Sequence, residues 1–92
     1  MSISIRTFKG FGIDAIDGFA GSVHEFIFDE RLRKIQGIVI NTGIFLEPDL
    51  RIINPVTVLK LDLTERRLFV NLTKKEILYS PKVKKEQSLL PS

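Results

Sequence analysis

The chain contains no cysteine and no tryptophan, and it has a single histidine among its 92 residues. Without cysteine it can form no disulfide framework, zinc–thiolate site or thiol nucleophile. The lone histidine, His24, excludes any metal or proton-relay site that takes two histidines from one chain. No serine or threonine lies in the nucleophile-elbow motif of a hydrolase. We therefore expect no catalytic residue, no metal and no cofactor.

Long apolar runs are also missing. The longest reach three residues, as in Ile38–Ile40, whereas a membrane-spanning helix needs about 20. Residues 1–6 lack the basic region and the apolar stretch that open a secretory signal. We therefore expect a cytoplasmic domain with no membrane insertion.

Charge of one sign is not concentrated in the body of the chain. Lysine and arginine number 14 against 11 aspartate and glutamate, which gives a net charge of +3. Two of these net positive charges belong to residues 80–92, so residues 1–79 are nearly neutral. Basic side chains in this body alternate with acidic ones, which is typical of solvated turns and not of a groove that follows a phosphate backbone.

What the sequence does contain favours β-strands, since it has twelve isoleucines and six valines against two alanines. Asp17-Gly18 predicts a tight hairpin and Gly21 a bulge, and Leu59, Leu61 and Leu63 share one face of a later strand. Strands are expected at residues 12–16, 20–28, 34–41, 50–54, 56–63 and 67–72. About six short strands at this regular spacing, almost without helix, indicate an antiparallel barrel or sandwich.

A helix signal closes the strand series. Thr73-Lys74-Lys75-Glu76 has the pattern of a capping box, which predicts a short C-terminal helix lying over an open end of the barrel. Pro81 then ends this helix. We therefore expect one β-barrel domain at residues 1–80, followed by a mobile tail rich in lysine, serine and proline at residues 81–92.

The strand expected at residues 20–28 is apolar on both of its faces. Simple alternation places Phe26 and Phe28 on one face and Val23 and Ile27 on the other. Two interpretations fit this pattern equally well. Either Phe26 and Phe28 form a dimer surface, or the strand is curled inside a barrel and buried on both sides.

An apolar tripeptide, Ile44, Phe45 and Leu46, occupies a loop between Gly43 and Pro48. Exposed aromatic and aliphatic side chains in a loop are typical anchors for a protein partner. The opposing interpretation is that Phe45 or Leu46 folds back and plugs the barrel. The tripeptide is therefore a candidate partner-binding site.

Several short motifs follow one another at defined spacings along residues 5–81. In chain order they are Gly10-Phe11-Gly12-Ile13, Asp17-Gly18, Gly21-Ser22-Val23, Phe28-Asp29, Ile38-Val39-Ile40, Thr42-Gly43, Arg51-Ile52-Ile53-Asn54-Pro55, Val70-Asn71-Leu72-Thr73-Lys74-Lys75-Glu76-Ile77 and Ser80-Pro81. In this order the chain resembles the PRC-barrel domain, a family named for the cytoplasmic barrel of the photosynthetic reaction centre H subunit. The family also includes the C-terminal barrel of a ribosome-maturation factor and stand-alone prokaryotic proteins, and the chain is most similar to the stand-alone class.

The resemblance implies an all-β fold: a small, closed and strongly bent antiparallel β-barrel of about six strands with one short C-terminal helix. It also implies an adaptor or assembly module that docks to proteins and is not an enzyme. On this basis we expect a homodimer that binds a protein partner. The alternative is an RNA- or ribosome-associated factor akin to the maturation-factor barrel, and nucleic acid would be met only through such a ribosomal complex.

Overall fold

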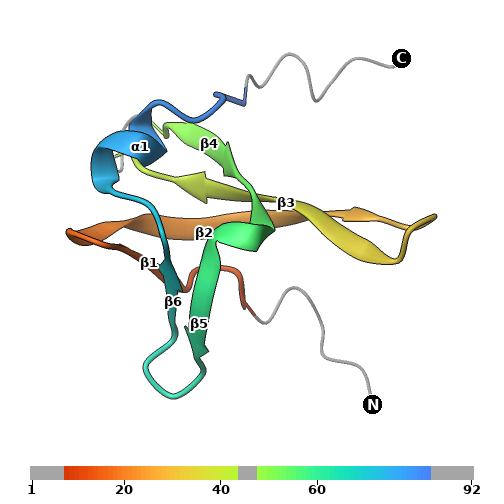
Figure 1. The fold of residues 1–92 in the computed structure, drawn as a ribbon, viewed down its shortest axis with the longest axis horizontal. Helices are drawn as coiled ribbons and strands as arrows, with labels where there is room; N and C mark the ends of the chain where they lie inside the picture. The colour runs from red at the N-terminus through yellow and green to blue at the C-terminus, as the bar shows by residue number, and fades with distance from the viewer. Residues whose placement is uncertain (1–7, 44–47, 84–92) are drawn as a thin grey trace.

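The structure, a computed structural model, describes residues 8–43 and 48–83, and a single six-stranded sheet dominates it (Figure 1). The strands are β1 (Gly12–Ala15), β2 (Gly18–Asp29), β3 (Lys34–Asn41), β4 (Leu50–Ile53), β5 (Val58–Asp62) and β6 (Arg67–Val70). A 3-10 turn, η2 (Pro55–Thr57), precedes β5, and a short helix, α1 (Lys74–Leu78), follows β6. The predicted strand-rich fold with one short C-terminal helix is therefore confirmed.

The strand order is β4-β3-β2-β1-β6-β5. All neighbouring strands are antiparallel except β1 and β6, which are parallel. The prediction of a purely antiparallel sheet is therefore wrong, because β1 and β6 are not joined by a hairpin that would fix opposite directions. The sheet also remains open between its edge strands β4 and β5 in the described residues, so closure into a barrel is not confirmed.

The core is formed mainly by inward-facing side chains of the sheet. Alternate residues of β1 and of β6 are buried, which is the period of two expected for strands with one face inward. Ile77 of α1 joins them from outside the sheet. The core cluster consists of Phe11, Ile13, Ala15, Val23, Ile38, Ile40, Ile53, Leu68, Val70 and Ile77. Residues 37–40 of β3 are all buried, so this part of the strand is covered on both faces.

The hairpin between β1 and β2 forms as predicted. Ala15 pairs with Gly18, so the loop consists of Ile16 and Asp17, and Gly18 has a φ of +132°. The predicted bulge is also present, because Ala20 is an extra residue in the pairing of β2 with β1, next to Gly21. Asp17-Gly18 and Gly21 therefore predicted the hairpin and the bulge correctly.

A second bulge changes which side chains of β2 face the core. The step from Val23 to Glu25 along β2 spans one step along β3, so His24 is an extra residue. As a result Val23 lies in the core cluster, against which Phe26 also packs. The prediction that Val23 shares a face with Ile27, opposite Phe26, is therefore wrong, because strict alternation does not hold across a bulge.

The predicted capping box begins α1. The Thr73 hydroxyl accepts from the Glu76 N–H at 3.1 Å, and the Glu76 carboxylate accepts from the Thr73 N–H at 2.8 Å. The Lys74 N–H donates to Oδ1 of Asp17 at 2.8 Å, which ties the helix to the β1–β2 hairpin. The buried side chain of Ile77 then anchors this short helix in the core.

The chain beyond α1 returns to the sheet along β4. The Ile52 N–H donates to the Pro81 carbonyl at 3.0 Å, and the Val83 N–H donates to the Leu50 carbonyl at 2.9 Å. Part of the predicted tail therefore covers the outer edge of β4. The rest of the tail, residues 84–92, lies outside the described residues, and its mobility stays a prediction.

Candidate binding site

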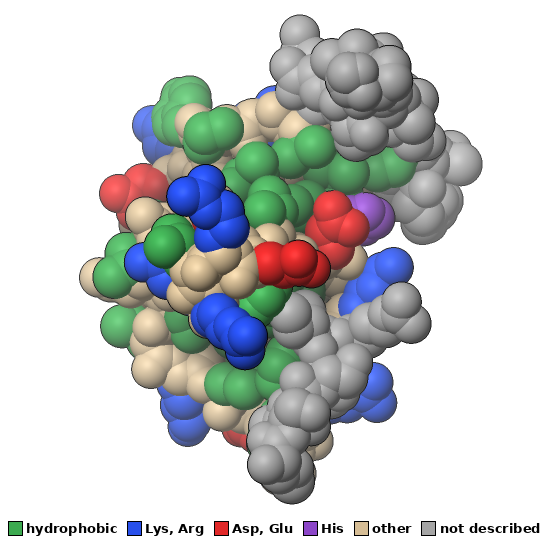
Figure 2. All heavy atoms as spheres, turned by 90° about the vertical axis from the view of Figure 1, so that its right-hand side faces the viewer, with side chains coloured by type: hydrophobic (Ala, Val, Ile, Leu, Met, Phe, Trp, Pro, Cys, Tyr) green, Lys and Arg blue, Asp and Glu red, His purple; other side chains and the backbone are tan. Residues whose placement is uncertain are grey.

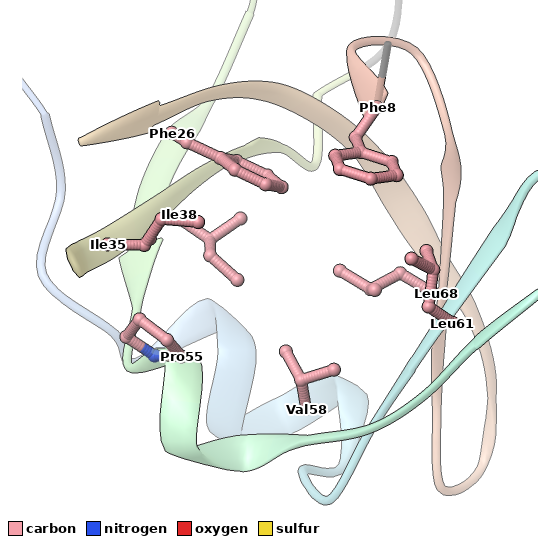
Figure 3. A pocket seen from close by; sticks show the side chains of 8 residues that line it. All are labelled: Phe8, Phe26, Ile35, Ile38, Pro55, Val58, Leu61 and Leu68. Carbon is pink, nitrogen blue, oxygen red and sulfur yellow. The ribbon is translucent and has the colours of Figure 1, made fainter. Parts of the chain in front are cut away.

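An apolar cavity of about 280 Å³ opens where the sheet fails to close (Figure 3). It lies between the β2–β3 hairpin on one side and η2, β5 and β6 on the other. In Figure 3 the side chains surround a common space, with α1 behind it. The lining residues are Phe8, Phe26, Ile35, Ile38, Pro55, Val58, Leu61 and Leu68.

The wall on the β2–β3 side is largely aromatic. Phe26 pairs with Ile38 across the two strands, so both side chains stand on the same face of the sheet. The ring of Phe8 stacks on that of Phe26, with centroids 5.8 Å apart, and meets Phe11 edge to face at 5.5 Å. These ring contacts fix the wall, because Phe11 is itself part of the core.

The opposite wall comes from the segment that leaves β4. Asn54 caps η2 by accepting from the Val56 N–H at 2.9 Å, and Pro55 occupies the first position of the turn. This turn redirects the chain, so the strand expected at residues 56–63 is the shorter β5. Leu61 then pairs with buried Leu68 and forms the rim, with 39% of its surface exposed.

All eight lining side chains are apolar, and within the described part of the chain no polar or charged side chain is buried. A cavity of this kind can hold an apolar group by excluding water from it. Among the described residues, the cavity lining presents no side-chain acid, base or nucleophile to that group. The chemistry available at the site is therefore burial of hydrophobic surface.

The clear pKa shifts belong to groups that do not line the cavity. Asp14 accepts from Arg67 at 2.8 Å and Asp49 accepts from Arg51 at 3.0 Å. Hydrogen bonds from these arginines hold the pKa of both carboxyl groups below the usual range, although partial burial opposes the shift. The first pair joins β1 to β6, and Arg51 also donates to the Ser80 carbonyl at 3.1 Å. Both pairs therefore hold elements of the fold together.

The sequence-predicted site residues have different positions. Phe26 is half-buried and lines the cavity. Phe28, two residues further along β2, is 44% exposed and lies in a separate shallow hollow with Glu30 and Arg33. The candidate loop residues Ile44, Phe45 and Leu46 lie outside the described residues, so whether they dock to a partner or plug a barrel stays a prediction.

Sequence reasoning did not single out the other half of the cavity. The prediction that Leu59, Leu61 and Leu63 share one strand face is wrong, because Leu59 is the extra residue of a bulge and Leu63 lies beyond the end of β5. Of the three, only Leu61 lines the cavity. Val58 and Pro55 carry no signal of their own beyond strand and turn propensity. These residues become a site only because β5 does not meet β4.

Hydrophobic side chains elsewhere on the surface are interspersed with charged ones. Figure 2 views the molecule from the side on which the β2–β3 hairpin projects in Figure 1, and shows hydrophobic side chains lying among basic and acidic ones. The exposed large hydrophobic residues are Ile16, Phe19, Ile27, Phe28, Leu32, Val56, Leu59, Leu61, Leu63, Leu78 and Tyr79.

Two further features of the described residues bear on the class of protein. Residues 8–43 and 48–83 contain no cluster of three or more histidine, aspartate or glutamate side chains that could hold a metal ion. Nor does this part of the chain include a helix with the length and hydrophobicity of a membrane span. Comparison with protein-family models and with curated protein sequences finds no match.

Proposed function

We propose that the protein is a non-catalytic protein-binding module whose cavity receives an apolar side chain of a partner protein. The observation that carries this proposal is the open cavity lined by eight apolar side chains, with aromatic rings on one wall. In protein interfaces, a few aromatic or aliphatic anchors that fill such pockets supply most of the binding energy.

The lining of the cavity favours a protein partner over a small ligand. Sites for small molecules usually measure about 300–1,000 Å³ and carry a few placed polar groups that orient the ligand. At about 280 Å³ this cavity is near the lower end of that range, but its lining side chains carry no polar group that could orient a ligand. One or two apolar side chains of a folded partner fit a cavity of this size, and the partner's own fold orients them without polar groups in the cavity.

The sequence motifs support a further part of the proposal, that the module is a stand-alone prokaryotic protein of the PRC-barrel type. In this proposal the sheet belongs to a closed, strongly bent barrel. We also propose that it acts in the cytoplasm, because small secreted domains commonly depend on disulfides and this chain has no cysteine. We propose in addition that it forms a homodimer, because a chain of 92 residues has a small core and self-association would add to its buried surface. The ribosome-associated alternative is less favoured, since Arg51 and Arg67 are held by aspartates.

The proposal is tested by filling the cavity. Ile35 lines the cavity, whereas Leu32, in the same hairpin, is exposed and does not. Peptides selected from a displayed library on the wild-type protein should share an aromatic or branched aliphatic residue. They should lose binding to Ile35→Trp and keep it with the matched control Leu32→Trp. Peptides that bind both variants equally, or no enrichment at all, would contradict the proposal.

A further inference from the structure

In the described residues, another segment of the chain covers one edge of the sheet and leaves the other edge uncovered. The outer edge of β4 is hydrogen-bonded to residues 81–83. At the other end of the sheet, β5 pairs with β6 on one side only, and no described residue covers its outer edge. An uncovered strand edge presents unpaired backbone donors and acceptors and is a template for another strand.

Apolar and charged residues alternate in the sequence along β5 and into the turn that follows it. Leu59, Leu61 and Leu63 are 65%, 39% and 57% exposed. Lys60 and Asp62 stand between them, and neither forms an ion pair within the described part of the chain. The edge therefore exposes leucines beside two uncompensated charges of opposite sign.

The order of these residues is self-complementary. Reversal of Leu59–Leu63, as in an antiparallel partner, exchanges Lys60 with Asp62 and leaves the leucines in place. We propose that a second copy of the chain pairs antiparallel with β5 about a two-fold axis through Leu61. In this register Lys60 lies opposite Asp62 of the partner subunit.

The geometry of β5 suits this register. Lys60, Leu61 and Asp62 pair with three consecutive residues of β6, so this stretch is regular. Leu59 is the extra residue of a bulge and Leu63 lies in the turn after β5, so the register depends on these three residues. Lys60 and Asp62 therefore point to one face, where Lys60 lies 5.7 Å from the ring centroid of Phe69. Leu61 points to the opposite face, into the cavity.

The neighbours of Asp62 leave its charge available. Arg67, directly opposite on β6, is already paired with Asp14. One oxygen of Asp62, Oδ1, accepts from the Glu65 N–H at 3.0 Å and so shapes the β5–β6 turn. A lysine from a second copy would supply the charge partner that β6 does not.

This inference rests on the homodimer of the proposed function and specifies its surface. Charge reversal tests the register, because Lys60→Asp and Asp62→Lys each place like charges opposite one another twice in the dimer. Either variant alone should weaken self-association by roughly tenfold or more, measured by analytical ultracentrifugation. An equimolar mixture should recover a heterodimer, since one chain is then acidic at both positions and the other is basic.

Two controls keep this test decisive. Lys75→Asp reverses an exposed charge on α1 and should leave the dimer intact, and so should Lys60→Arg, which keeps the charge at position 60. If Asp62→Lys fails to fold because the turn has lost its cap, the contrast between Lys60→Asp and Lys60→Arg still tests the register.

The outcomes separate this inference from the proposed function. A wild-type dimer that persists in both charge variants would overturn the β5 surface and leave a homodimer through another face. A wild-type chain that stays monomeric up to about 1 mM would overturn both the surface and the homodimer, because a dissociation constant above this concentration is weaker than that of a specific complex. The cavity is decided independently by the peptide selection with Ile35→Trp.

Discussion

At the scale of single residues, the absence of a side chain at Gly21 fixes how β2 passes the end of β3. A Cβ at this position would lie 2.3 Å from the Asn41 carbonyl oxygen, and the φ of +149° is unfavourable for any residue with a side chain. Gly21→Ala should therefore lower the free energy of unfolding by at least about 3 kcal/mol, measured by denaturant titration.

Gly10 provides the control for the Gly21 substitution. Its φ is also positive, at +90°, but nothing lies within 4 Å of a Cβ built there. Gly10→Ala should lower the free energy of unfolding by only about 1 kcal/mol, the cost of a positive φ for a residue with a side chain. Equal losses at the two glycines would show that the close approach to Asn41 contributes nothing.

The Asp14–Arg67 pair makes stability depend on pH. The hydrogen bond from Arg67 lowers the pKa of Asp14 in the folded state, so the folded protein binds the proton less readily than the unfolded chain. This contribution is therefore fully present above the unfolded pKa of about 3.9 and is lost as the pH falls through the lower, folded pKa. Asp14→Asn should reduce stability at neutral pH, and the difference from wild type should shrink below about pH 4.

Thermal melts of both proteins across this pH range would measure the effect. Glu30→Gln, an exposed substitution in the β2–β3 turn, serves as the control and should follow the wild-type curve at every pH. A constant offset between Asp14→Asn and wild type from neutral to acid pH would rule out a contribution from the ionised carboxylate.

At the scale of strands, turns and helices, the features whose signals lie in neighbouring residues could be predicted from the sequence. The bounds expected for the third strand, residues 34–41, are those of β3, and the capping box at Thr73 begins α1 as expected. The hairpin at Asp17 and the bulge beside Gly21 also form. Each signal lies within a few residues of its effect, and no distant partner is needed to interpret it.

Features that depend on pairing between distant segments could not be predicted in this way. The extra residue His24 is defined by what lies opposite it on β3. The parallel contact of β1 with β6 joins segments far apart in the sequence, where no turn indicates direction. Strict alternation therefore gave the wrong face for Val23, because His24 is an extra residue in β2.

The candidate site shows the same division. Phe26 could be selected because it is an aromatic residue in a strand that is apolar on both of its faces. Val58 and Leu61, which face it across the cavity, are ordinary strand residues in sequence. Their role follows from the gap between β4 and β5, which is a property of the whole sheet.

At the scale of the whole molecule, the open side of the sheet relates the cavity to both of its edges. Because η2 turns the chain away from β4 before β5 begins, the edge strands do not pair and their inner side chains border a cavity. The chain then covers one edge with residues 81–83 and leaves the other uncovered in the described residues. A domain of this size has a small core, so edge coverage is a substantial part of its stability.

Truncation tests the coverage of β4. A chain ending at residue 80 loses the two backbone hydrogen bonds to Leu50 and Ile52 and the 3.9 Å contact between Lys82 and Asp49. At roughly 0.5–1.5 kcal/mol for each hydrogen bond, it should unfold with about 1–3 kcal/mol less free energy, measured by urea titration. A chain ending at residue 83 keeps all three contacts and should match the full chain. If the two truncations are equally stable, residues 81–83 do not contribute to the fold, and the domain ends at residue 80 as the sequence alone suggests.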